Sequence, residues 1–112
     1  MDIFQSTSDS GILTLTLNGR LDADTTAQFG ELLNGCIDRG DRKIVLDLSG
    51  VDYVSSVGLR ALILGAKRLA PLGGRIVLCA PQDRIRHLLD IAGFGSIFTI
   101  AATRDDAAEQ LR

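Results

Sequence analysis

Residues 47–60 read DLSGVDYVSSVGLR, and this stretch joins a predicted strand to a predicted helix. Just upstream, the run Ile44–Leu46 is apolar, as in strands that are covered on both faces. Downstream, apolar residues recur at helical spacing, namely Leu59, Leu62, Ile63, Ala66 and Leu69. An amphipathic helix therefore begins close to Ser55 or Ser56, and either hydroxyl can cap it.

The two serines have a plain structural interpretation and a functional one. Serine is among the commonest N-cap residues, so a cap needs no function to explain it. Only one of the two serines is needed as the cap, however, so the other hydroxyl has no structural role. The helix also carries the small residues Gly58, Ala61 and Gly65. We expect these three opposite the apolar stripe, where small exposed residues let another backbone come close. A hydroxyl at such a helix start can be switched by phosphorylation.

The rest of the chain alternates between strand and helix patterns. The predicted strands lie near residues 2–5, 12–17, 44–48, 75–80 and 97–100. The three other predicted helices begin near Asp24, Pro81 and Thr103. The alternating pattern of residues 12–17 puts Leu13, Leu15 and Leu17 on a core face. The strand, helix and strand around the motif form a unit that is normally parallel and right-handed.

The motif resembles the signature of STAS domains, specifically of the free-standing anti-sigma factor antagonists. Three more segments resemble features of that family in the expected order: the turn Gly19–Asp22, the glycine turn with the following strand at Gly73–Leu78, and the helix end Ile91–Phe94. The resemblance implies an α/β fold, in which one STAS domain spans residues 1–112. Such a domain has a mixed β-sheet of about four to five strands packed against about four α-helices.

The resemblance also implies the site residues. In that family the phosphorylated hydroxyl is usually a serine that follows an aspartate and precedes the motif glycine by two residues, and this position falls on Ser56. Ser55 stands at the usual aspartate position, and Val57 stands where many members have a second Ser or Thr. These departures leave Ser55 as an alternative acceptor. Asp22 reads as a turn and cap residue, and it also matches an acidic position near the phosphoserine end of the family fold, where it could orient the acceptor or meet the kinase.

The function implied by the resemblance is a binding switch in a partner-switching pathway. The unmodified form would sequester a GHKL-type serine kinase that is also an anti-sigma factor. The sigma factor or other regulator that this kinase restrains would thereby be released. The kinase would phosphorylate Ser56, and a metal-dependent serine phosphatase would restore the binding form. The partner-binding residues would be Asp22, Tyr53, Ser55, Ser56, Val57, Gly58 and Ala61.

Two alternatives stay open. A non-switching STAS scaffold, or an accessory subunit of a signalling or transport complex, would share the fold and use Ser56 only as a cap. A small-molecule or nucleotide-binding module is the second alternative, although the sequence offers no specific pocket residues for it. The segment Gly73–Gly74 precedes a strand and no Walker lysine follows it, so it is no phosphate loop.

Composition narrows the function classes further. At 112 residues the chain is one domain by length. A net charge of -2 with both signs interspersed argues against a nucleic-acid partner. No apolar stretch approaches the roughly 20 residues of a membrane helix, and residues 1–6 do not read as a secretion signal. We therefore expect a cytoplasmic protein without direct membrane insertion.

Catalytic chemistry has little support in the sequence. Ser56 lacks the Gly-x-Ser-x-Gly elbow and a recognisable base. His87, the one histidine, lies on the polar side of its helix. Cys36 and Cys79 fall at core-facing positions and are expected to be buried and reduced. We expect no enzyme, no cofactor and no metal.

Overall fold

The computed structural model describes all 112 residues and contains a five-stranded mixed sheet in the order β1-β2-β3-β4-β5. The strands are β1 (Asp2–Thr7), β2 (Ile12–Leu21), β3 (Lys43–Val54), β4 (Arg75–Cys79) and β5 (Thr99–Ala101). The α-helices are α1 (Ala23–Asp38), α2 (Ser56–Leu69), α3 (Asp83–Ile91) and α4 (Arg104–Leu111). Only β1 runs antiparallel to its neighbour, and the other three pairings are parallel. The predicted α/β fold with a mixed sheet and four helices is confirmed.

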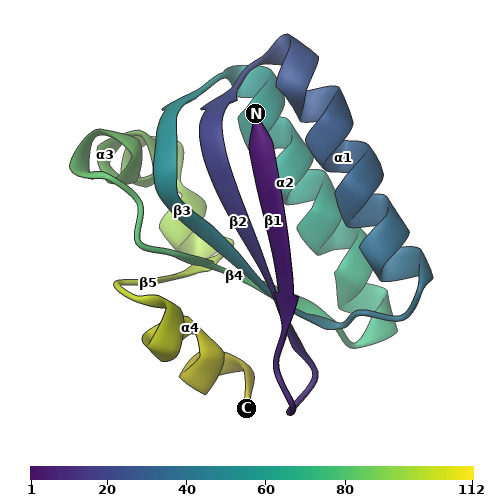
Figure 1. Ribbon diagram of the computed structural model, residues 1–112. Helices are drawn as coiled ribbons and strands as arrows, with labels where there is room; N and C mark the ends of the chain where they lie inside the picture. The colour runs from purple at the N-terminus through teal and green to yellow at the C-terminus, as the bar shows by residue number, and fades with distance from the viewer.

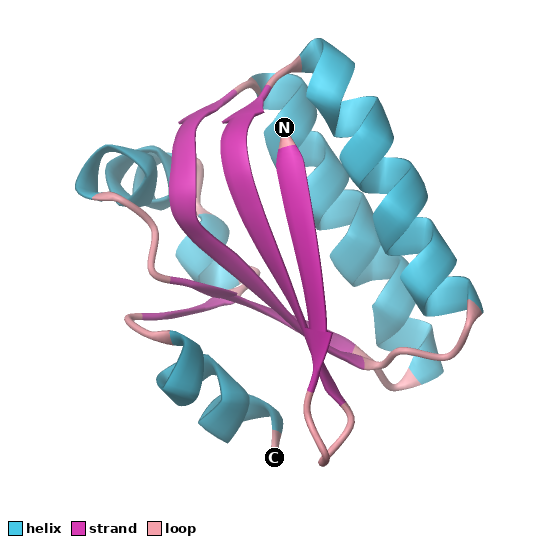
Figure 2. Ribbon diagram, in the orientation of Figure 1, coloured by secondary structure: helices cyan, strands magenta, loops and turns pink.

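The sheet separates two apolar layers. Helices α1 and α2 lie side by side along one face, and α4 covers part of the other (Figures 1 and 2). Because side chains alternate along a strand, Leu13, Leu15 and Leu17 of β2 pack under α1 and α2, as predicted. Their neighbour Ile12 belongs to the smaller cluster under α4. No helix combines the length and the hydropathy that a membrane span requires.

Strands β2 and β3 are longer than the sequence predicts. Pairing between them continues through two register shifts, and both strands then finish together at Leu21 and Val54. The segment after Leu48, which lies beyond the predicted strand, is therefore part of the ladder. Glycine at position 50 makes this pairing possible. Any larger residue would clash with Asn18 of β2, since a Cβ here would lie 1.8 Å from the Asn18 side-chain oxygen. Tertiary pairing overrides local turn propensity here.

The prediction that Gly58, Ala61 and Gly65 form an exposed face of small residues is wrong. Gly58 and Gly65 are buried, and Ala61 is half-buried. A Cβ on Gly58 would lie 2.9 Å from the carbonyl oxygen of Leu21, and one on Gly65 would lie 2.6 Å from a methyl carbon of Leu33. These glycines allow α2 to approach β2 and α1 closely, so they serve packing within the domain.

One carboxylate is buried on the α4 side of the sheet. Asp47, whose side chain is 5% exposed, forms an ion pair with Arg104 at the start of α4. Its carboxylate also accepts a hydrogen bond of 2.9 Å from the Ser49 amide, and Arg104 donates to the Thr16 hydroxyl. Burial alone would raise the pKa of Asp47, but the bonds from Ser49 and Arg104 outweigh it and hold this pKa below its usual value.

Replacing Arg104 with Met is expected to destabilise the fold by about 1–3 kcal/mol at neutral pH, because the buried carboxylate loses a charged donor. Because folding lowers the pKa of Asp47, the ionised carboxylate stabilises the folded state at any pH above the ordinary carboxyl pKa of about 4. This stabilisation is lost as the pH falls through the lowered pKa of the folded protein. The difference in free energy of unfolding between the wild type and Arg104→Met should therefore become smaller in acid. Urea unfolding across a pH series measures it.

Arg86→Met is the matched control, because Arg86 pairs with Asp90 at the surface, where both side chains are about half exposed. This variant should cost less than about 0.5 kcal/mol. The role of the buried pair would be contradicted if Arg104→Met lowered the free energy of unfolding no more than Arg86→Met does. It would also be contradicted if the loss caused by Arg104→Met did not depend on pH.

Candidate functional site

The candidate site lies where β2 and β3 end and the helices α1 and α2 begin, at the upper end of the molecule in Figure 1. The amide of Ser55 donates a hydrogen bond of 2.9 Å to the carbonyl of Leu21. This bond joins the β3–α2 junction to the β2–α1 junction. Residues that are more than 30 positions apart in sequence are thereby brought to one surface.

The two serines take different roles. Ser55 is the N-cap of α2, and its hydroxyl accepts a hydrogen bond of 3.2 Å from the Gly58 amide. Ser56 is the first residue of the helix, is exposed, and has a hydroxyl with no hydrogen-bond partner in the protein. The cap is therefore Ser55, and the free hydroxyl is Ser56. It stands at the positive end of the α2 dipole, where amides of the first turn lack intrahelical acceptors.

Asp22 is the N-cap of α1, which confirms its structural interpretation. One of its carboxylate oxygens accepts bonds of 3.0 Å from the amides of both Asp24 and Thr25, and the Thr25 hydroxyl in turn accepts from the Asp22 amide. The bond from the Thr25 amide is the main reason why the pKa of Asp22 lies below its usual value. Asp22 is thus an anion at neutral pH. Its second oxygen lies 3.9 Å from Nε of Arg20.

Beside this anion, the predicted residue Tyr53 is joined by two arginines that the sequence analysis did not assign to the site. Arg20 and Tyr53 are register partners on β2 and β3, and the Arg20 guanidinium lies 4.3 Å from the centre of the Tyr53 ring. Near Tyr53, Arg84 of α3 donates a bond of 2.7 Å to the Asp52 carbonyl. A shallow pocket of about 260 Å³ lies between the two arginines. Its lining combines two cations with an aromatic ring.

The structure brings most of the predicted site residues together. Asp22, Tyr53, Ser55, Ser56 and Val57 all lie at this end, and the Val57 side chain is about half exposed. Two predicted residues lie apart from this surface. Gly58 is buried beneath it, whereas Ala61 lies one turn along α2 in the groove against α1.

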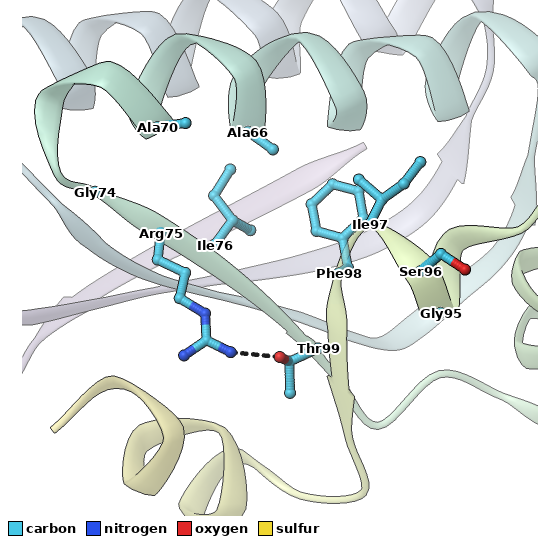
Figure 3. A pocket seen from close by; sticks show the side chains of 10 residues that line it. All are labelled: Ala66, Ala70, Gly74, Arg75, Ile76, Gly95, Ser96, Ile97, Phe98 and Thr99. Atoms are coloured by element: carbon cyan, nitrogen blue, oxygen red, sulfur yellow. Dashed lines mark hydrogen bonds between the residues drawn. The ribbon is translucent and has the colours of Figure 1, made fainter.

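The largest cavity, about 330 Å³, lies elsewhere, beside the C-terminal half of α2 (Figure 3). Its one charged group, Arg75, already donates to the Thr99 hydroxyl and to the carbonyl of Gln110. No carboxylate, histidine or thiol lines this cavity. Its residues offer no acid–base pair and no nucleophile with a partner base.

The cysteines are buried and free, as predicted. Burial raises the pKa of the Cys79 thiol to about 11, and burial also raises that of Cys36. Both thiols are therefore protonated at neutral pH and are poor nucleophiles.

Comparison with known proteins points to one family. The family model described as STAS domain matches residues 4–107. BtrV of Bordetella bronchiseptica is 40% identical over 98 residues, which cover 88% of this chain and 84% of BtrV. The anti-sigma F factor antagonist of Paenibacillus polymyxa is 28% identical over 102 residues, covering 90% of this chain and 87% of the relative. The Bacillus cell fate determinant SpoIIAA, solved in its phosphorylated form, has a TM-score of 0.77 and 20% identity, covering 99% of this chain and 100% of SpoIIAA.

Proposed function

Because the chain belongs to the STAS domain family, and within it to the anti-sigma factor antagonists, we propose that it is a phosphorylation-controlled binding switch. Its unphosphorylated form binds a GHKL-type serine kinase that acts as an anti-sigma factor. Phosphorylation of Ser56 releases this partner, and a metal-dependent serine phosphatase resets the switch. The observation that carries the proposal is the free, exposed hydroxyl of Ser56 at the start of α2.

The position of Ser56 suits a group that must gain and lose a phosphate. A phosphate adds roughly -1.5 to -2 charge units at pH 7. At a helix N-terminus this charge meets unpaired amides and the positive end of the dipole, so the helix tolerates it. The fold therefore has little reason to change on phosphorylation. The existence of a phosphorylated form of SpoIIAA, which shares the fold, is consistent with such a switch.

The surroundings of Ser56 suggest what the partner recognises. Asp22 supplies an anion, Arg20 and Tyr53 supply a stacked cation and ring, and Val57 supplies an apolar contact. We propose that these residues form the docking surface, together with the backbone of the Ser55 junction. A phosphate added at its centre would have to be desolvated in the complex or meet a surface shaped for a hydroxyl, which costs several kcal/mol.

Ser56 rather than Ser55 is the proposed acceptor, and this assignment is directly testable. The Ser55 hydroxyl is engaged as a cap, whereas that of Ser56 is free. Incubation with the cognate kinase and ATP should label Ser56, and Ser56→Ala should abolish the label. Ser55→Ala should keep the label and lose about 1 kcal/mol of stability, because the cap is removed. Peptide mapping and urea unfolding measure the two effects.

The opposite pattern would overturn the assignment. If Ser56→Ala is labelled as strongly as the wild type, or if the phosphate is found on Ser55, then the free hydroxyl is not the acceptor. The scaffold alternative relied on Ser56 serving only as a cap, and Ser55 holds that role instead. A kinase captured equally with and without ATP would nevertheless favour a scaffold.

A further inference from the structure

The two edges of the sheet differ in how they are protected. The edge strand β5 has three residues, a length too short to pair well with another chain. The other edge strand, β1, has six residues and pairs with β2 without a bulge or register shift. It contains no proline and no lysine, and its one charged residue is Asp2 near its start. Strand β1 therefore lacks the devices that usually prevent edge-to-edge pairing.

Helix α1 runs along this edge, as Figure 2 shows. Near one end of β1, the Gln28 side chain donates to the Met1 carbonyl at 3.4 Å. Near the other end, the Arg39 guanidinium donates to the Gln5 side chain at 3.2 Å. Since a strand rises about 3.3 Å per residue and a helix about 1.5 Å, Phe4 lies level with the turn of α1 around Gly35. Gly35 is exposed, and a Cβ there would meet no atom within 4 Å.

Phe4 is an unusual residue for the open face of an edge strand. Its neighbours Ile3 and Gln5 point toward α1, so its own side chain points to the opposite face, where it is 59% exposed. The residue across from it on β2 is Thr16. The domain itself thus offers this ring no aromatic or aliphatic partner in the adjacent strand.

We propose that a second copy of this chain pairs with β1 in the antiparallel direction, with the two-fold axis at Phe4. The two sheets then become one continuous sheet, and the two Phe4 rings stack across the axis on its open face. This interface goes beyond the proposed switch, because β1 contributes no residue to the Ser56 surface. An isologous contact of this kind closes on itself and gives a dimer.

The charges on both elements fit this axis. Asp2 falls opposite Ser6 of the second copy, so no like charges meet along the strands. On the helices, Gly35 falls level with Gly35 of the second copy, which allows the two α1 helices to approach. Glu31 and Arg39, the C-cap residue of α1, each lie four residues from Gly35, and both are exposed. Each Glu31 is therefore level with Arg39 of the second copy. Arg39 already pairs with Asp41 of its own chain at 2.6 Å, so Glu31 would share this cation with Asp41.

Sedimentation equilibrium over a concentration series tests the dimer. The wild type is expected to show a reversible monomer–dimer equilibrium. Phe4→Arg puts two like charges directly opposite each other at the axis and should weaken association at least about tenfold. The control is Ile91→Arg, which changes another exposed apolar residue and lies in α3, away from β1. It should associate like the wild type, and circular dichroism should show both variants folded.

Thiol cross-linking then tests the register, since the two native thiols are buried. Phe4→Cys should link to itself with a short bifunctional maleimide, because directly opposed Cβ atoms are about 4.5–5.5 Å apart. Ser6→Cys should not link to itself, because its two copies are offset by about 13 Å. A mixture of Asp2→Cys and Ser6→Cys should form a mixed pair. A wild type that stays monomeric throughout, a dimer unaffected by Phe4→Arg, or equal self-linking at positions 4 and 6 would each overturn the proposal.

Discussion

Phosphorylation of Ser56 is expected to weaken binding of the kinase at least about a hundredfold, which corresponds to about 2.8 kcal/mol. The cost arises at the interface, where the phosphate must be desolvated against a partner that fits a hydroxyl. Titration calorimetry on the unmodified and phosphorylated proteins measures this change. Ser56→Ala should bind like the unmodified protein and stay locked in that state. Ser56→Asp should imitate the phosphate only partly, because it brings one charge and fewer acceptor oxygens.

The same experiment separates a local mechanism from a conformational one. Because the α2 N-terminus stabilises an anion, backbone amide shifts should change only near Ser56 and the Asp22 turn. Shifts that spread through the sheet and α3 would mean that the switch rearranges the domain. Equal affinity of both forms would contradict the switch itself and leave the scaffold alternative.

Replacing Gly58 with Ala should destabilise the fold by about 1–3 kcal/mol, as expected of overpacking. In a helix this substitution normally stabilises by about 0.5–1 kcal/mol, so the sign is reversed. The reason is that the new methyl group would lie 2.9 Å from the Leu21 carbonyl oxygen and 3.0 Å from the Leu21 side chain. A carbonyl held in a sheet cannot move away cheaply. Urea unfolding with an unchanged slope measures the effect.

Two other glycines provide the matched controls. At Gly30 of α1 a Cβ meets nothing within 4 Å, so Gly30→Ala should stabilise the fold by about 0.5–1 kcal/mol. At Gly65 the nearest atom is a methyl carbon of Leu33, which can rotate away, so this variant should fall between the other two. A Gly58→Ala protein as stable as Gly30→Ala would show that α2 has room to shift from β2.

Periodicity and turn chemistry predict much of this fold. The alternating leucines of β2, the cap at Thr103 and the break between α2 and β4 are all local signals, and the structure has them. The burial of Gly58 and Gly65 was missed because a glycine has no side chain whose polarity could assign it to a face. Gly58 and Gly65 nevertheless stand at helical spacing from Leu62 and Leu69, on the same face of α2. The helical period alone therefore predicts that both glycines are buried.

The candidate site is only partly predictable from the sequence, because its geometry depends on how β2 and β3 pair. The pattern located Ser55, Ser56 and Asp22, but it could not say which serine is the cap, since that depends on where β3 ends. The stacking of Arg20 on Tyr53 depends on the register between β2 and β3, which two shifts displace from a regular ladder. Such pairings between distant segments have no local sequence signal.

The hydrogen bond from Ser55 to Leu21 has a consequence for the lifetime of the protein in the cell. The Asp22 turn and the Ser56 hydroxyl share one surface only when β2 and β3 are paired, so a kinase that docks there, as proposed, would bind only the folded chain. Binding to the folded state alone adds about 2.7 kcal/mol of stability when the free partner is at a hundred times its dissociation constant. Captured molecules should therefore resist proteolysis, and each phosphorylation event should return the chain to the pool that proteases can degrade.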